Sequence, residues 1–399
     1  MLNKSEFQNH LTNDLLPFWN NLYDTEYGGF YGSVDKNNNI NKKSIKSAVL
    51  QTRLLWFYSA CYKQLQDKKL FDFAKLQFDF LTKHMIDSTD GGVYWSVEYD
   101  GKIKNNQKHT YVHAFMLYAI SAYYSVNKGE SALITANRLF NLIENDFKDE
   151  YGYTEPYNID YPDLEKTRTM NTLLHIIEAY TEYYQATKSE KARNALEYAL
   201  NLVINKAYND NLSRFDCYFD QFMKPVSDML SYGHDIEASW LIYRACEVLG
   251  NNDITNNLAP KLEKVAQNVI SKGFINAGKN GIYYHYKNGV ENKLRSWWVM
   301  SEAIVALVHQ YNLYGSDKSM ILAENIWNYV KKHFISPYGE WYGHINDKGE
   351  LNQSSNSAAL VGPWKCPYHN GRMCLEVNNP TQTPIGDMDV ACGANRKLD

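Results

Sequence analysis

Hydrophobic positions along the chain follow two alternating periods. Long stretches place apolar residues three and four positions apart, the spacing of a helix with one buried face. Between them lie short pieces in which apolar and polar residues alternate, as they do in strands. The helical pattern predicts twelve helices, at residues 4–22, 45–64, 69–86, 109–127, 130–146, 167–186, 189–207, 233–250, 255–273, 295–314, 318–334 and 366–377.

The strand-like pieces share a glycine and aromatic motif that returns every 59 to 67 residues. Its copies read GGFYGSVD from Gly28, GGVYWSVEYDGK from Gly91, YGYTEPYN from Tyr151, SRFDCYFD from Ser213, NGIYYHYKNG from Asn280 and GEWYGHINDKGE from Gly339. A steady period over a whole chain indicates repeated architecture. Each repeat holds two helices and one short hairpin, so the sequence predicts six helix pairs.

The two helices of a repeat differ in character. Those at 69–86, 130–146, 189–207, 255–273 and 318–334 have an apolar face and a charged face. Their partners carry single polar or aromatic residues within apolar stretches, and a buried charge or imidazole is costly without a partner. Six such helices therefore indicate one shared polar centre. The predicted fold is all-α, an (α/α)6 toroid with six inner and six outer helices and short β-hairpins at one rim.

No linker rich in Pro, Gly or Ser divides the repeats, so residues 1–378 are predicted to form one domain. Residues 379–399 lack periodicity and are interpreted as a mobile C-terminal extension. The net charge of −4, without a basic stripe, argues against a nucleic-acid partner. The absence of an apolar signal segment, of a stretch of about 18 apolar residues and of any CxxC pair predicts a cytoplasmic protein with free thiols and no membrane partner. Monomer and dimer are equally compatible with the sequence.

Candidate chemistry is concentrated on the inner helices. His175 and Glu178 are three positions apart, as are His234 and Glu237, so each pair shares a helix face. The apolar flanks of both pairs favour a buried site over surface ion pairs. Arg53, within LLWF, is positioned either to clamp a carboxylate or to face a developing oxyanion. Two further histidines have other readings: His109 caps its helix or faces the site, and His113 packs in the core.

The segment with the highest concentration of candidate site residues is GPWKCPYHNGRMCLEV, residues 362–377. Two prolines hold Trp364, Lys365 and His369 near the start of the last inner helix. This set of side chains, with Arg372, exceeds what closing a ring requires. His and Glu at helical spacing also suit zinc or manganese, but no HExxH motif and no Cys–His cluster occurs, so no metal is predicted.

The segments PFWNNLYD, RLLWFYSACY, KHTYVHAF, TMNTLLHIIEAYTEYY, SYGHDIEASWL, WWVMSEAIV and KCPYHNGRMCLE follow one another in an order that resembles the N-acylglucosamine 2-epimerase superfamily. The resemblance covers about residues 5–378 and is strongest to the branch that acts on β-1,4-linked disaccharides. It implies a cofactor-free epimerisation at C2 of the reducing-end glucose of cellobiose or lactose. The segment 157–168, which would border the substrate cleft, is shorter than is usual in that branch.

Matching motifs imply the roles of individual residues. The catalytic set is Arg53, His175, His234 and His369, supported by Glu237. The implied substrate-binding set is Tyr111, Asn171, Trp240, Trp297, Trp298, Glu302 and Trp364. A disaccharide is thus the expected small-molecule partner, and no cofactor is expected.

The chemistry of the residues fits this reaction. Inverting C2 needs an open-chain aldehyde, a base for the C2 proton and an acid on the opposite face, and histidine serves both tasks near neutral pH. His234 and His369 are interpreted as the two bases, with Glu237 orienting the ring of His234. Arg53 and His175 would stabilise the cis-enediolate. No GxGxxG motif indicates a nicotinamide.

Three other functions remain open at this stage. The chain could be an (α/α)6 glycoside hydrolase that uses Glu237 and Glu302, a sugar-binding protein without catalysis, or a monosaccharide enzyme of the same superfamily acting on N-acylglucosamine or mannose. Hydrolysis does not require three inward-facing imidazoles. A binding protein would need the tryptophans but not the histidines.

Overall fold

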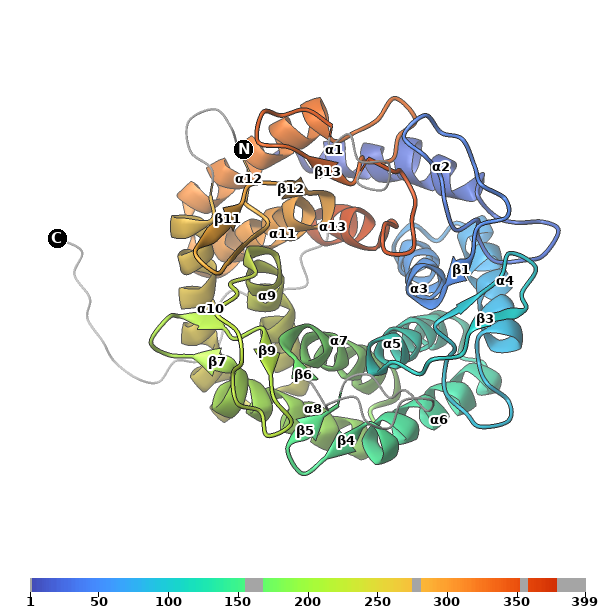
Figure 1. Ribbon diagram of the computed structural model, residues 1–399, viewed down its shortest axis with the longest axis horizontal. Coiled ribbons are helices and arrows are strands. Elements are labelled where there is room, and N and C mark those ends of the chain that lie inside the picture. Colours follow the sequence, from blue (N-terminus) through green and yellow to red (C-terminus); the bar gives the residue numbers. More distant parts are fainter. Residues whose placement is uncertain (1, 155–167, 275–280, 352–357, 379–399) are drawn as a thin grey trace.

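The computed structural model describes residues 2–154, 168–274, 281–351 and 358–378. The predicted extension 379–399 and most of the segment 157–168 lie outside this part of the chain. Figure 1 shows two concentric rings of helices. The inner ring consists of α3 (Ala48–Leu65), α5 (Thr110–Asn127), α7 (Met170–Thr187), α9 (Tyr232–Leu249), α11 (Trp297–Tyr314) and α13 (Tyr368–Asn378). Each inner helix contacts the next, and α13 contacts α3. The (α/α)6 prediction is confirmed.

The outer ring begins at the N-terminus. A continuous helical stretch runs through α1 (Lys4–Asn9), a π-helical segment His10–Leu15 and α2 (Leu16–Asn20). The other outer helices are α4 (Lys68–His84), α6 (Glu130–Asp146), α8 (Glu190–Leu202), α10 (Asn252–Lys272) and α12 (Asp317–His333). The sequence predicted one regular helix at 4–22. The π segment ends two residues before Pro17, which has no N–H to continue the regular ladder of hydrogen bonds.

The first five inner helices end in the same way. The residue after each helix is left-handed: Gln66, Lys128, Lys188, Gly250 and Gly315 have φ between 53° and 67°. An outer helix starts two residues later, so the chain reverses at once. Because every outer helix returns the chain to the same rim, all inner helices run parallel. Their N-termini meet at one mouth of the ring.

Short strands lie at this mouth, in the segments that lead from each outer helix to the next inner helix. β1 (Lys46–Ser47) pairs with β2 (Ser96–Val97), which also pairs with β3 (Ile103–Asn105). The remaining pairs are β4 (Lys148–Asp149) with β5 (Gly152–Tyr153), β6 (Arg168–Thr169) with β9 (Tyr218–Phe219), β7 (Tyr208–Asn209) with β8 (Arg214–Phe215), β10 (His285–Lys287) with β11 (Val290–Asn292), and β12 (Arg295–Ser296) with β13 (His344–Ile345). All pairs are antiparallel.

A bridge between Val34 and Val361 joins the first rim segment to the last and closes the ring. A buried ion pair also occurs twice at the rim, where a lysine before an inner helix binds a carboxylate in a neighbouring turn. The Lys46 ammonium donates to Asp24 at 2.7 Å, and that of Lys108 donates to Asp87 at 2.7 Å. Both pairs are buried, so losing one partner would leave an uncompensated charge. These bonds fix the rim against the inner helices that carry the site.

The described cysteines are free, as predicted. Among the described helices, none combines the length and apolar character needed to cross a membrane.

Candidate active site

A cavity opens at the mouth where the inner helices begin. Its volume is about 360 Å³, within the range of small-molecule sites. All six inner helices contribute to it. Its lining consists of Arg53, Tyr111, Asn171, His175, His234, Glu237, Tyr284, Trp297, Trp298, His344, Trp364 and His369. Of the predicted site residues, only Trp240 and Glu302 are missing from this lining.

Two of the cavity histidines bind a carboxylate through the same ring nitrogen. His175 Nδ1 lies 2.9 Å from Glu178 Oε2, and His369 Nδ1 lies 2.7 Å from Glu302 Oε1. An ionised carboxylate only accepts hydrogen bonds, so Nδ1 carries the proton in both neutral rings. Their Nε2 atoms are left with a lone pair. Both rings are therefore set up to accept a proton.

The third histidine has a partner of a different kind. His234 Nδ1 lies 2.8 Å from the hydroxyl oxygen of Ser231, the N-cap of α9. A hydroxyl either donates or accepts, so both neutral tautomers of His234 keep this bond. His234 can thus present either a lone pair or an N–H at Nε2.

Burial keeps these imidazoles neutral. It lowers the pKa of His234 to about 3. Burial, with Arg53 and Arg372 nearby, holds the pKa of His369 well below its ordinary value. Burial also lowers the pKa of His175, although the bond to Glu178 opposes the shift. Neutral imidazoles are what proton abstraction at neutral pH requires.

Trp298 connects the two histidines predicted to move protons. The indole lies 4.9 Å from the ring of His234 and 5.6 Å from that of His369, between centroids. This approach depends on Gly233, because a Cβ there would lie 2.3 Å from Cη2 of Trp298. The glycine before the catalytic histidine thus makes room for the tryptophan.

Arg53 is a buried cation that faces neutral groups. Its guanidinium donates to the Tyr111 hydroxyl at 2.9 Å and to the Trp364 carbonyl at 3.3 Å. It stacks on the rings of Phe115 and Tyr368. Within the described residues it forms no salt bridge, unlike the buried Arg372. The sequence left a carboxylate clamp and an oxyanion partner open for Arg53, and the geometry favours the second.

Three buried carboxylates surround Arg372, and one of them, Glu237, also lines the cavity. The guanidinium donates to Glu178, to Glu237 at 2.7 Å and to Glu302 at 2.7 Å. Burial alone would raise the pKa of Glu178, but Arg372, His175 and Tyr368 lower it to about 2. Burial and the neighbouring Glu302 raise the pKa of Glu237. The pair Glu237 and Glu302 is therefore suited to share one proton.

Ligand atoms of Glu237, Glu302 and His369 lie within 4.8 Å of one another, close enough to hold a metal ion. Arg372 already donates to both carboxylates. The third ligand atom, His369 Nδ1, is bonded to Glu302. A divalent ion would have to displace the guanidinium and break that bond, so the donor set does not favour a metal.

Three expectations about these residues are wrong. Glu237 does not orient His234, because Arg372 binds its carboxylate and Ser231 binds the imidazole. Trp240 is no wall of the cavity: it is 1% exposed and donates to Glu302 at 3.0 Å. Glu302 is fully buried and orients His369 instead of lining the substrate space.

Aromatic side chains surround the outer part of the cavity. Trp364 is 45% exposed and lies 5.5 Å from Tyr111 and 5.9 Å from Trp95, between ring centroids. Trp297, in contrast, is buried against the Lys365 ammonium. Trp364 is thus an open aromatic face at the entrance.

Two lining residues were missed by the sequence reasoning. Tyr284 and His344 come from rim hairpins, within the motifs NGIYYHYKNG and GEWYGHINDKGE. Tyr284 packs edge-on against Trp298, with centroids 6.2 Å apart. The motifs were visible, but they were interpreted only as linkers between helices. Had the rim been placed over the helix N-termini, their aromatic and imidazole groups would have been candidates.

The two remaining histidines are also placed. His113 is in the core, as predicted: its Nδ1 donates to the His109 carbonyl and its Nε2 accepts the N–H of Val93. His109 occupies the N-cap position of α5, but its side chain makes no capping bond. Its ring packs against Trp95, with centroids 4.3 Å apart.

Comparison with known proteins gives a consistent picture. Residues 29–362 match the family model described as N-acylglucosamine 2-epimerase (GlcNAc 2-epimerase). The chain is 38% identical to a cellobiose 2-epimerase of Ruminococcus albus, over 94% of this chain and 97% of that protein. It is 36% identical to a cellobiose 2-epimerase of Eubacterium cellulosolvens, over 92% and 96% of the two chains. The solved cellobiose 2-epimerase of Bacillus thermoamylovorans superposes with a TM-score of 0.88 at 35% identity, covering 94% of this chain and 98% of that one.

Proposed function

This chain belongs to the N-acylglucosamine 2-epimerase family, and we propose that it inverts C2 of the reducing-end glucose of β-1,4-linked disaccharides such as cellobiose and lactose. Its relatives named cellobiose 2-epimerase match it along nearly the whole chain. One observation carries the proposal: two neutral histidines, half-buried His234 and buried His369, flank one tryptophan, beside the buried Arg53, which forms no salt bridge among the described residues.

The reaction begins with the open-chain aldehyde of the reducing-end sugar. His234 or His369 takes the C2 proton at Nε2, and the electron pair of the broken C–H bond forms the C1–C2 double bond. The carbonyl electrons move to O1, giving a cis-enediolate. The histidine on the opposite face, which enters this step as an imidazolium, donates its Nε2 proton to C2, and the C1 carbonyl forms again. The first histidine then releases its new proton to solvent and the second takes one up, which restores the starting state. Proton and electron counts balance without a redox cofactor.

The negative charge of the intermediate grows on O1 and O2. Arg53 would stabilise it, because a cation without a carboxylate partner keeps its charge for the substrate. His175 would donate to the same oxygens once protonated, or open the sugar ring as a general acid. The parallel inner helices add to this effect, since their N-termini carry partial positive charge.

Hydrolysis fits this geometry poorly. An inverting hydrolase needs an acid and a base on opposite sides of the scissile bond, about 6.5–9.5 Å apart. Glu302 is buried outside the cavity lining, and Arg372 bonds both Glu302 and Glu237. Neither carboxylate is available as an independent catalyst.

The function is tested by incubating the purified protein with cellobiose in deuterated water and following the sugar by NMR. We expect deuterium at C2 and a product with mannose at the reducing end, with the glycosidic bond intact. Release of glucose would instead show a hydrolase. An unchanged sugar would leave only a binding protein, and exchange seen with N-acetylglucosamine or free mannose but not cellobiose would move the chain to another branch of the family.

A further inference from the structure

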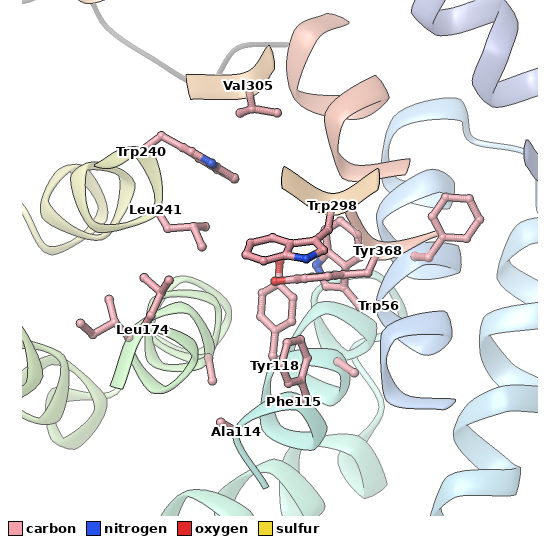
Figure 2. Close-up of a cluster of buried hydrophobic side chains, with 14 of the residues drawn as sticks. Trp56, Ala114, Phe115, Tyr118, Leu174, Trp240, Leu241, Trp298, Val305 and Tyr368 are labelled. Carbon is pink, nitrogen blue, oxygen red and sulfur yellow. The ribbon is translucent and has the colours of Figure 1, made fainter. Parts of the chain in front are cut away.

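Arg372 occupies the centre of the inner ring, directly beneath the cavity. Its guanidinium takes partners from three other inner helices, namely Glu178 of α7, Glu237 of α9 and Glu302 of α11. It is 1% exposed and stacks on Trp240 and on Tyr368 of its own helix. Figure 2 shows Tyr368 projecting into the middle of the ring beside Trp56, Phe115 and Tyr118. No other residue in the described chain bonds to all three carboxylates.

Two of these carboxylates hold the site histidines. The path runs from His175 to Glu178, from Glu178 to Arg372, from Arg372 to Glu302 and from Glu302 to His369. The helix of Arg372 makes a second contact with Glu178, because the hydroxyl of Tyr368 donates to this carboxylate at 2.6 Å. Arg372 therefore connects the orienting groups of two imidazoles that lie on different helices.

The charges around the site balance only with Arg372 present. Arg53 and Arg372 supply two positive charges. Three carboxylates face Arg372, and Glu237 and Glu302 are close enough to share a proton, which leaves two negative charges. With this balance the imidazoles stay neutral. Without Arg372 the carboxylates would be in excess, and a histidine bonded to one of them would take up a proton to compensate.

We propose that Arg372 is a positioning residue that keeps His175 and His369 neutral and in the Nδ1–H tautomer, acting through Glu178 and Glu302. It does not line the cavity, so it acts on the reaction only through these groups. The inference rests on the proposed function for its catalytic meaning, but the protonation of the histidines is measurable without any substrate.

The test is a pH titration of the histidine rings by NMR, with 13C at Cε1, in the wild type and in Arg372→Met. His369 is assigned by the signal that disappears in His369→Gln. The charged and titratable groups around His369 are Glu178, Glu237, Glu302, Arg53, Arg372 and His175. Removing one cation from this set raises the pKa of the imidazole. We expect the titration midpoint of His369 to move up by at least one pH unit.

The kinetic profile should change in the same direction. The base must be unprotonated, so the acidic limb of the pH profile of kcat/KM should move to higher pH in Arg372→Met. Raising the pH should then recover part of the turnover that the variant has lost. The pH profile of Arg372→Lys should lie between those of the wild type and Arg372→Met, because an ammonium supplies the charge but not the planar, forked set of donors of a guanidinium. A merely structural arginine would lower turnover equally at every pH and leave the His369 midpoint in place, and that result would overturn the proposal.

Two further variants keep the test decisive. Arg244→Met is the control: Arg244 forms an ion pair with Glu376 of α13, and neither group contacts a site histidine. It should leave the midpoint unchanged. The double variant Arg372→Met with Glu178→Gln removes one charge of each sign, and it should return the midpoint toward the wild-type value; a double variant no closer to wild type than the single one counts against the charge balance.

If Arg372→Met does not fold, Glu302→Gln decides. The amide keeps the shape of the side chain but removes the carboxylate bonded to His369 Nδ1, so the imidazolium loses its direct partner and the midpoint should fall instead of rise. An unchanged midpoint contradicts the proposal. If these titrations behave as expected but no C2 exchange occurs on cellobiose, the charge network stands and the proposed function fails.

Discussion

The partner of one ring nitrogen decides what a site histidine can do with the other. A carboxylate fixes the tautomer of His369, whereas the Ser231 hydroxyl leaves both tautomers open to His234. A reversible epimerase needs each face to work as base in one direction and as acid in the other. His369 is protonated at Nε2 only as an imidazolium, which Glu302 stabilises. His234 lacks such a carboxylate, so the two faces differ in basicity.

The two-base mechanism predicts the effect of replacing either imidazole. His234→Gln and His369→Gln should each lower turnover at least about a hundredfold, the scale of a lost general acid or base. Sugar binding should survive, because the aromatic lining stays in place. Turnover is followed by C2 deuterium exchange and binding by calorimetry. His84→Gln, on the outer helix α4, is the matched control and should keep wild-type activity; a catalytic variant that retains more than a tenth of turnover would refute the two-base mechanism.

Metal removal tests the role of Arg372 as the cation of the carboxylate cluster. Because its guanidinium bonds both Glu237 and Glu302, prolonged dialysis against EDTA should leave turnover unchanged. Mass spectrometry of the purified protein should find no stoichiometric divalent metal. Activity that is lost on dialysis and restored by zinc or manganese would assign the cluster of Glu237, Glu302 and His369 to a metal.

At the scale of elements, the inner helices could be predicted because their signal is local. Apolar spacing along each stretch gives the helix, and a single polar residue within it marks the inward face. The same spacing placed His175 and Glu178 together correctly. It failed for His234 and Glu237, because a shared face does not make two side chains partners. Glu237 is bound by Arg372, 135 residues away, and such contacts across a ring leave no trace in the spacing within one helix.

Gly233 lies in the first turn of α9 and Gly250 directly follows the helix, so replacing each one tests a different role: packing at the site for Gly233 and helix termination for Gly250. Gly233→Ala would push a methyl group into Trp298, since the added Cβ lies 2.3 Å from the indole. We expect kcat/KM to fall at least tenfold, with the fold retained. Gly250 has φ +67° and open space around it, so Gly250→Ala should cost about 1 kcal/mol of stability and leave kcat/KM unchanged. Circular dichroism melts and exchange kinetics distinguish the two, and equal losses of activity would contradict the role given to Gly233.

At the scale of the whole molecule, the ring brings the ends of the chain to the same site. Arg53 lies on the first inner helix and Trp364 lies four residues before the last one, yet Arg53 donates to the Trp364 carbonyl. Figure 1 shows α3 and α13 as neighbours where the ring closes. The entrance is therefore complete only when the sixth repeat meets the first. Its outer part is aromatic, formed by Trp364 with Tyr111 and Trp95.

An open tryptophan at this entrance bears on the size of the substrate. The reacting glucose must reach His234 and His369, which leaves Trp364, 45% exposed, to stack on a second sugar ring. Binding of that ring in the transition state should make kcat/KM at least tenfold higher for cellobiose than for glucose, about 1.4 kcal/mol. Trp364→Ala should reduce this difference by lowering kcat/KM for cellobiose and not for glucose. Phe222→Ala removes a comparably exposed aromatic ring outside the cavity, and it should leave kcat/KM unchanged for both sugars. If the wild type has equal kcat/KM for cellobiose and glucose, the site is that of a monosaccharide enzyme.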